Sequence, residues 1–420
     1  MRASAWSTNR DIAAARVNWE RARVIADALP DDDPGSTAMR ITPRTMLCVS
    51  SWRAAESDST DRFEELRELC TAAGDKASLA IGMTGLATEL LWTGRAREAS
   101  LLASEQMALL ESIGDPSLTI GAAYVAIVIK GATGEIADVL RWSQSVIDLA
   151  DGDAAKGANF AMGSPLAAAL GFRGYARYWF GLAGWHQDLD DAFAMARRSD
   201  PVTHALLVTG INGLAVVNGV LQADGFPVRE IEETLQIAER SIGDTALGSV
   251  KLFLGAMLTH RPALEDRHRG LDLVTQVRDK WVRKRTRLYL IPSADLVIAR
   301  ERARHGDHVV AIPAMRTAVE ELFQIGQLGA CVTGAATLVE TLLERGAEND
   351  IVEARSVIER LANVSDYDRS ALCDIWLLRL SALLSRARGD DVTYQHLVNR
   401  YRTMAESFGF EGHIAMAEAM

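Results

Sequence analysis

Two stretches of the sequence indicate its fold: GRAREASLLASEQMALLESI (residues 94–113) and GEIADVLRWSQSVIDLADGD (residues 134–153). They share few letters, yet small or apolar residues follow each glycine at the same offsets, forty positions apart. Steps of three and four residues place these positions on one face of a helix. The aligned pairs are Ala96 and Ile136, Ala99 and Val139, Ala103 and Ser143, Met107 and Ile147, and Leu110 and Ala150.

The segment before Gly94 predicts a second helix, so the repeating unit is a helix hairpin. Residues 76–93 read KASLAIGMTGLATELLWT, with leucines and a methionine at helical spacing, and Gly94 is suited to end this helix. A single hairpin cannot bury both of its apolar faces, but stacked hairpins shield one another. The same phase returns after several further glycines, namely Gly184, Gly225, Gly306, Gly346 and Gly389.

These patterns predict an all-α protein, a right-handed α-solenoid of tetratricopeptide-like helix hairpins with a period of about 40 residues. We expect an N-terminal helical segment over residues 1–73 and the solenoid over residues 74–420. The period is irregular at 154–185 and at 260–290. No segment alternates with a period of two, so almost no strand is expected.

Composition limits the function classes. The 420 residues are 48% hydrophobic, which excludes general disorder, and the formal charge of −11 disfavours nonspecific binding of nucleic acid or anionic lipid. The four cysteines are far apart, which favours reduced thiols in the cytoplasm. Residues 201–223 carry no charge, but their polar and glycine content favours a buried helix over a membrane span.

Aromatic residues gather in the irregular stretch between residues 172 and 185, and two interpretations are open. Tyr175, Tyr178, Trp179 and Trp185 could line a groove for a ligand or peptide, because aromatic side chains offer a large contact area. The same residues could instead form a packed junction between two halves of the array.

The segment RDKWVRKRTRLY (residues 278–289) is the one dense basic stretch, and it is a candidate site for an acidic partner. It could equally be the solvated face of a repeat that pairs with neighbouring acidic helices. Its basic residues are Arg278, Lys280, Arg283, Lys284, Arg285 and Arg287.

Motifs for catalysis or cofactor binding are absent from the sequence. It holds no phosphate-binding G-x-x-x-x-G-K-[ST], no G-x-S-x-G and no H-E-x-x-H, so we predict no catalytic residue and no cofactor. The spacing of the histidine-bearing segments is not typical of a metal site, and we expect exposed loops there. These segments contain His260, Glu265, Asp266, His268, His305 and His308.

Two stretches carry a family resemblance: G-R-x-x-E-A at residues 94–99 and ESFGFEGHIAMAEAM at residues 406–420. The chain resembles the C-terminal tetratricopeptide-like helical region of multidomain actinobacterial, especially mycobacterial, adenylate/guanylate cyclase–AAA ATPase proteins, some of which add a LuxR-type DNA-binding domain. That resemblance implies a helical repeat module of a signalling or transcriptional regulator. No cyclase or ATPase residue is carried over, because the Walker motif and the cyclase aspartates have no counterpart here.

The sequence therefore predicts a non-catalytic, cytoplasmic module for protein interaction or effector sensing. Its expected partner is a protein or peptide, or a small-molecule effector, without metal, nucleic acid or membrane, and the oligomeric state stays open. One alternative is a nucleic-acid-associated regulator that uses residues 278–287. Another is an enzyme with an unrecognised site near the aromatic segment 172–188, where His186 and Asp188 lie.

Overall fold

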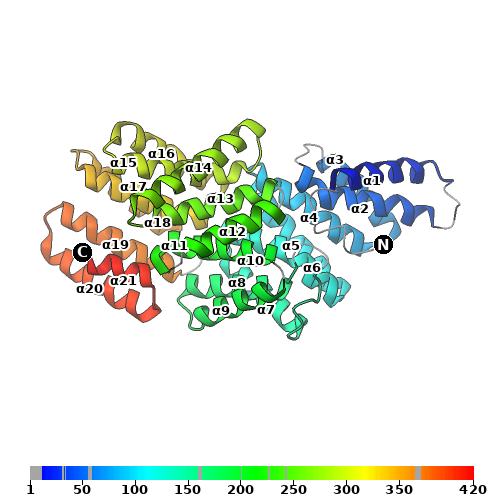
Figure 1. Cartoon of the computed structure of the whole chain (residues 1–420), viewed down its shortest axis with the longest axis horizontal. Coiled ribbons are helices and arrows are strands. Elements are labelled where there is room, and N and C mark those ends of the chain that lie inside the picture. Colours follow the sequence, from blue (N-terminus) through cyan, green and yellow to red (C-terminus); the bar gives the residue numbers. More distant parts are fainter. Residues whose placement is uncertain are drawn as a thin grey trace.

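A computed structural model describes residues 12–30, 33, 35–54, 59–158, 163–199, 201–225, 228–241, 244–364 and 370–420. Across these ranges every regular element is a helix and no strand occurs, which confirms the all-α prediction (Figure 1). Consecutive helices pack against each other in pairs along the chain.

The helices are numbered in chain order. Their bounds are α1 Ile12–Asp27, α2 Ser36–Ala54, α3 Ser59–Ala73, α4 Lys76–Trp92, α5 Ala96–Ile113, α6 Pro116–Thr133, α7 Ile136–Ala150, α8 Pro165–Phe180, α9 Trp185–Ser199, α10 Pro201–Leu207, η2 Val208–Asn212, α11 Gly213–Val217, η3 Ala223–Gly225, α12 Val228–Ser241, α13 Asp244–Thr259, α14 Leu264–Lys284, η4 Leu288–Leu290, α15 Ile291–Arg304, α16 His308–Ile325, α17 Leu328–Arg345, α18 Asp350–Val364, α19 Ala371–Ala387, α20 Asp391–Phe408 and α21 Glu411–Glu418.

Glycines in the left-handed region separate the two helices of a hairpin. Gly94, Gly134 and Gly306 have φ of +83°, +79° and +85°. Glycine adopts this conformation without strain because it has no Cβ, whereas other residues are strained there. Each follows the first helix of its pair, and the second helix begins within two residues. The helix ends predicted at these glycines are therefore confirmed.

The uncharged stretch 201–223 folds as a broken helix. A π-helical turn, η2, lies between α10 and α11, and most side chains of this segment are buried. Within the described residues, α6 is the one helix long and apolar enough to cross a membrane, and 56% of it is buried inside the protein. Burial of that extent is typical of a core helix.

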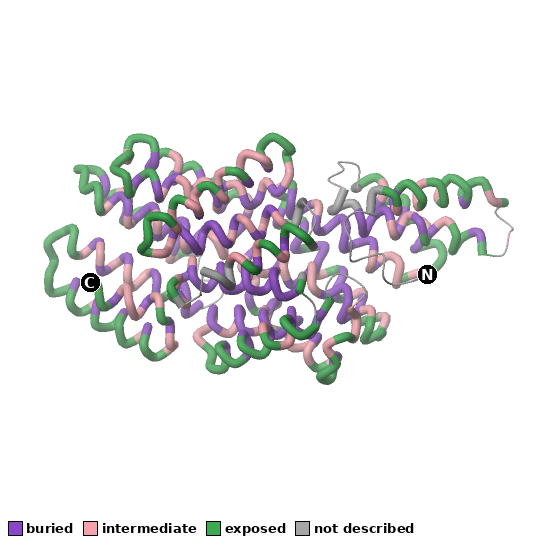
Figure 2. The backbone as a smooth tube through the Cα atoms, viewed as in Figure 1, coloured by how far each residue is buried: buried purple, intermediate pink, exposed green. Residues whose placement is uncertain are grey.

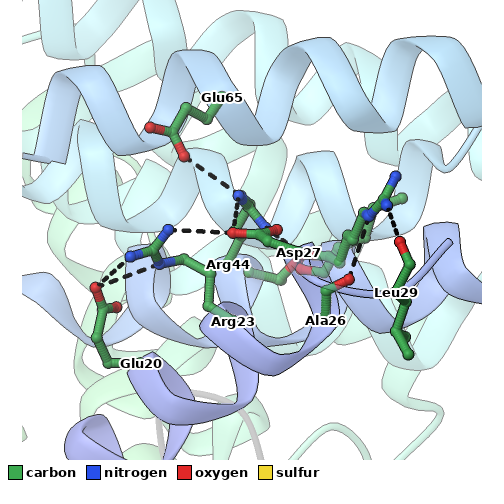
Figure 3. A network of polar contacts seen from close by, with 10 residues as sticks. Glu20, Arg23, Ala26, Asp27, Leu29, Arg44 and Glu65 are labelled. Atoms are coloured by element: carbon green, nitrogen blue, oxygen red, sulfur yellow. Dashed lines mark hydrogen bonds and ion pairs between the residues drawn. The ribbon is translucent and has the colours of Figure 1, made fainter. Parts of the chain in front are cut away.

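Helices α1 to α3 form an arm at the N-terminal end, at the right of Figure 1. The arm joins the rest through α2 and α4, whose backbones touch so closely that a Cβ on Gly85 would overlap the carbonyl oxygen of Cys48. A network of ion pairs links its three helices (Figure 3): Arg23 lies 2.9 Å from Glu20, and Arg44 lies 2.8 Å from Asp27 and 3.3 Å from Glu65.

Beyond the arm, the array curls until its later hairpins meet its earlier ones end to end. The C-terminal ends of α4, α6 and α8 face the N-terminal ends of α15, α17 and α19, which aligns helix dipoles head to tail. Three contacts mark these junctions: the Arg287 guanidinium lies 4.0 Å from the centre of the Trp92 ring, a Cβ on Gly329 would lie 3.3 Å from the Gly131 carbonyl oxygen, and the Ser370 hydroxyl donates to the Trp179 carbonyl at 3.2 Å.

A fourth junction joins α11 to α21. The ring of His413 donates from Nε2 to the Asn218 carbonyl oxygen at 3.1 Å, although 195 residues separate the two. The backbone N–H of His413 donates to the neighbouring Gly219 carbonyl at 2.8 Å. Buried residues follow the first helix of each hairpin, which we call the inner helix. Exposed residues gather on the second, outer helices and on the turns (Figure 2). The inner helices therefore surround a common interior.

Candidate ligand cavity

A cavity of about 1060 Å³ occupies this interior. Its wall comes from α4, α6, α8, α13, α15, α17 and α19, the first helices of their hairpins, and from the broken helix α10–η2–α11. Ligand pockets in proteins commonly span roughly 300 to 1,000 Å³, so this space is large enough for a sizeable organic molecule.

One side of the cavity is a continuous aromatic wall. Tyr124 of α6 meets Phe172 of α8 edge to face at a ring distance of 6.0 Å, and Phe172 meets Tyr175 in the same way at 6.4 Å. Trp179 extends the row, 6.0 Å from Tyr175. Burial raises the pKa of the Tyr175 hydroxyl above its usual range, so the ring stays neutral. The wall therefore offers apolar, uncharged contact area.

The aromatic segment predicted from the sequence divides between two places. Tyr175 and Trp179 line the cavity, whereas Tyr178 and Trp185 are buried elsewhere. Tyr178 accepts a hydrogen bond from the Asn218 side chain at 3.4 Å, and the Trp185 indole donates to the Phe408 carbonyl at 3.2 Å. Two of the four candidates thus face a possible ligand space, and the other two form a packed junction with the C-terminal hairpin.

The π-helical turn η2 forms part of the cavity wall. It contributes Thr209, Gly210 and Ile211 to the wall, and a Cβ added to Gly210 would meet nothing within 4 Å. π-Turns inside helices are frequent at functional sites because the extra residue displaces the backbone. The sequence signal was the cluster of glycines in TGINGLAVVNG, residues 209–219.

Arg287 forms one polar corner of the cavity. The residue is 7% exposed. Its Nη1 donates to the Ser249 hydroxyl at 2.8 Å, and its guanidinium stacks on Trp92. Among the described residues, Nε of Arg287 has no hydrogen-bond partner and no carboxylate lies within ion-pair distance. Burial lowers the pKa of this guanidinium, and only Tyr289 and Tyr124 act against that shift.

A second polar corner contains His260 and Arg300. His260 donates from Nδ1 to the Ala256 carbonyl at 2.8 Å and accepts at Nε2 from Arg300 at 2.5 Å, which requires a neutral ring. Burial, with a smaller contribution from the Arg300 charge, lowers the pKa of His260 to about 3. Arg300, whose pKa burial lowers to about 10, is in turn stabilised by the charges of Glu340, Glu301 and Glu344. The exposed loop expected at His260 was wrong, because this residue directly follows α13 and lines the cavity.

The cavity reaches solvent beside the C-terminal ends of α17 and α19. Glu344 and Arg386 belong to its lining and are both exposed. Deeper along the same two helices, Arg379 and Glu340 form an ion pair at 2.8 Å. The wall is therefore charged and internally paired near this mouth, and apolar farther in.

Five of the six residues of the predicted basic patch lie along α14 and at its end, and one turns into the cavity. Arg278 pairs with Asp295 at 2.8 Å, while Arg283, Lys284 and Arg285 are exposed where α14 ends. Lys280 is half-buried on the same helix. Arg287 turns inward, because its backbone adopts a left-handed conformation with φ of +52°. The patch thus loses its last member to the cavity.

Metal binding and thiol chemistry find little support in the described part of the chain. It contains no group of three or more histidine, cysteine, aspartate or glutamate side chains that could hold a metal ion. Burial raises the pKa of the thiols of Cys48, Cys70 and Cys331 to about 12, so they stay protonated. The large cavity is the remaining candidate.

Comparison with known proteins finds no matching family model and no significantly similar curated protein.

Proposed function

We propose that this chain is a non-catalytic effector-sensing module that binds a small organic molecule in its central cavity. The observation that carries the proposal is the cavity itself, about 1060 Å³ with a largely apolar wall built from hairpins at both ends of the array. Apolar side chains that line a cavity of this size have few protein atoms to contact on its inner side. A molecule that fills it would therefore stabilise the array on binding.

For the fold, we propose the finer description of a right-handed α-solenoid of tetratricopeptide-like hairpins with a period of about forty residues. The left-handed glycines Gly94, Gly134, Gly306, Gly346 and Gly389 support it, since each follows an inner helix. The resemblance to the C-terminal region of cyclase–ATPase regulators points the same way. We accordingly place the chain in the cytoplasm, as part of a signalling or transcriptional regulator.

Ligand binding would be transmitted through the end-to-end junctions. The cavity touches both sides of three of them: Trp92 and Arg287, Gly131 and Gly329, and Trp179 with the helix α19 that Ser370 caps. A ligand that prefers one spacing of these ends shifts the curvature of the array, because packed interfaces have few alternative arrangements. A partner protein bound on the outer helices could then read that change.

The two alternatives from the sequence receive less support. A nucleic-acid surface over residues 278–287 would lack Arg278, which is ion-paired, and Arg287, which lines the cavity. A catalytic site near residues 172–188 would need an available Asp188, yet this carboxylate is buried between Arg173 at 2.6 Å and Arg177 at 2.8 Å. We therefore develop neither alternative.

The test is retention of a small molecule by the purified chain. The protein is incubated with a small-molecule extract of its native cells, isolated again by gel filtration and examined by native mass spectrometry and thermal unfolding. We expect a bound species and a raised unfolding temperature. Gly210→Phe should abolish both, because its ring would occupy the cavity, while the control Val309→Phe on the exposed face of α16 should change neither. Absence of any bound species, or equal binding by Gly210→Phe, would contradict the proposal.

A further inference from the structure

Resting on the proposed function, we infer that the ligand of the cavity is an amphipathic carboxylic acid whose carboxylate pairs with Arg287 and whose apolar body lies along the aromatic wall. The carboxylate would meet the guanidinium beside Ser249 and Trp92. The body would extend past Tyr124 and Phe172 into the apolar interior.

The unused hydrogen-bonding capacity of Arg287 is the first argument. A guanidinium has five N–H donors, and those of Arg287 have one close partner, the Ser249 hydroxyl at 2.8 Å, and a longer one, the Tyr289 hydroxyl at 3.5 Å. The Nε donor is buried with no partner among the described residues. An unpaired buried charge is costly, and arginine in this state is suited to bind a planar anion through two parallel hydrogen bonds.

Arg300, the arginine at the other polar corner, differs from Arg287 in having carboxylates nearby. Both arginines line the cavity and both have their pKa lowered by burial. Three nearby glutamates stabilise the charge of Arg300 and the neighbouring Arg304 opposes it, whereas only tyrosine hydroxyls stabilise the charge of Arg287. The second corner therefore has carboxylates near its guanidinium, and the first corner has none among the described residues.

The sign of the whole cavity wall agrees with an anionic ligand. The chain carries a formal charge of −11, yet the described lining holds four arginines and two glutamates. Low-dielectric walls focus such a local excess of positive charge. An acidic chain with a basic interior attracts anions to that interior and not to its outer surface.

A carboxylate fits this corner better than a phosphate. One guanidinium balances the single charge of a carboxylate, whereas a phosphate monoester brings about −1.5 to −2 at neutral pH and would leave excess charge in an apolar space. The size of the cavity, about 1060 Å³, then calls for a long or ring-containing apolar body.

Calorimetric titration of the full chain with matched probes tests this inference. The probes are hexadecanoic acid with hexadecan-1-ol, and retinoic acid with retinol, all below their aggregation concentrations, and hexadecyl phosphate as a further anion. We expect at least one acid to bind about ten- to a hundredfold more tightly than its alcohol, the range for a charge-assisted hydrogen bond. Arg287→Met should reduce that acid to the affinity of the alcohol, and Arg283→Met, which removes an exposed charge of the same basic stretch, should not.

The outcomes separate this inference from the proposed function. Equal affinity of acid and alcohol in the unmodified chain would overturn the assignment of a carboxylate and leave cavity binding intact. Tighter binding of hexadecyl phosphate than of either acid would also overturn it. Binding of none of the probes would overturn it as well, while the retention experiment with Gly210→Phe judges the cavity separately. The ratio in the unmodified chain decides even if Arg287→Met fails to fold.

Discussion

The arginines of the N-terminal arm and those of the cavity wall use the same side chain in opposite ways. On the arm, Arg23 and Arg44 form ion pairs with carboxylates (Figure 3). These carboxylates are all partly exposed and belong to Glu20, Asp27 and Glu65. A small hollow of about 120 Å³ lies among these paired groups. Charges of this kind are satisfied within the chain and remain screened by water.

In the cavity, Arg287 is buried, stacked on an indole and left without a carboxylate among the described residues. Burial removes water from this charge, and no ion pair among the described residues offsets the free energy that this costs. The number of arginines in a region therefore says little about its function. What distinguishes a binding arginine is burial combined with unused donors.

The largest effect is expected from a substitution that separates the arm from the cavity-bearing array. Gly85→Ala should destabilise the chain by about 3 kcal/mol, because the added Cβ collides with the Cys48 backbone and α2 must move away from α4. Hydrogen exchange by region is the measurement, and protection should fall mainly in α1 to α3.

The matched control for that substitution is Gly210→Ala, which meets open space and should change stability by no more than about 1 kcal/mol. A uniform loss of protection over the whole chain in Gly85→Ala would show that the arm and the array unfold as one unit.

Mild acid should destabilise the array before it destabilises the arm. Burial lowers the pKa of His260 and His413 to about 3, so both stay neutral in the folded chain while their unfolded forms bind protons below pH 6.5. Their contribution to stability is complete above pH 6.5 and is lost as the pH falls, by about 1.4 kcal/mol per pH unit for each histidine. From pH 6.5 to 5, each accounts for about 2 kcal/mol.

On the arm, hydrogen bonding to Arg23 lowers the pKa of Glu20, and hydrogen bonding to Arg44 lowers the pKa of Asp27. These carboxylates stabilise the arm above their unfolded values of 4.5 and 3.8, so their contribution persists at pH 5. Urea unfolding at pH 7, 6 and 5 measures the difference. His413→Gln should flatten the pH dependence, and His396→Gln, on the exposed face of α20, should leave it unchanged. A pH-independent free energy of unfolding in this range would refute the buried neutral histidines.

The smallest effect is expected on the arm itself. Glu65→Gln removes one partner of Arg44 and should cost less than about 1 kcal/mol, because Glu65 is 56% exposed and Arg44 keeps Asp27. The loss should shrink further in 1 M salt. A double-mutant cycle with Arg44 in low and high salt measures it, and a coupling that salt does not weaken would mean that these arm charges are less solvated than their exposure indicates.

The helix hairpins could be predicted from the sequence because their signals are local. A glycine that ends an inner helix and apolar residues at steps of three and four lie within about twenty positions, as after Gly94 and Gly134. The cavity could not be predicted in this way. Its wall joins Trp92 to Arg287 and Trp179 to the start of α19, and no local pattern reports such distant contacts.

Arg287 shows how a signal can be present and still be misassigned. It ends a run of basic residues, and that company suggested a solvated surface. The residues that follow it, Leu288, Tyr289 and Leu290, are apolar, and they turn the chain inward to begin α15. A charged residue directly before such a trio is the feature that could have separated it from Arg283 and Arg285.

The end-to-end junctions also fix how long the chain between them can be. His413 reaches Asn218 across 195 residues, and Ser370 reaches Trp179 across 191. Inserting or deleting one hairpin between Asn218 and Arg287 would shift every later helix by one place, so that all four junctions would be mismatched together. Variation in length is therefore tolerated at the two outer ends and within loops. The geometry of the end-to-end junctions fixes the number of hairpins between them.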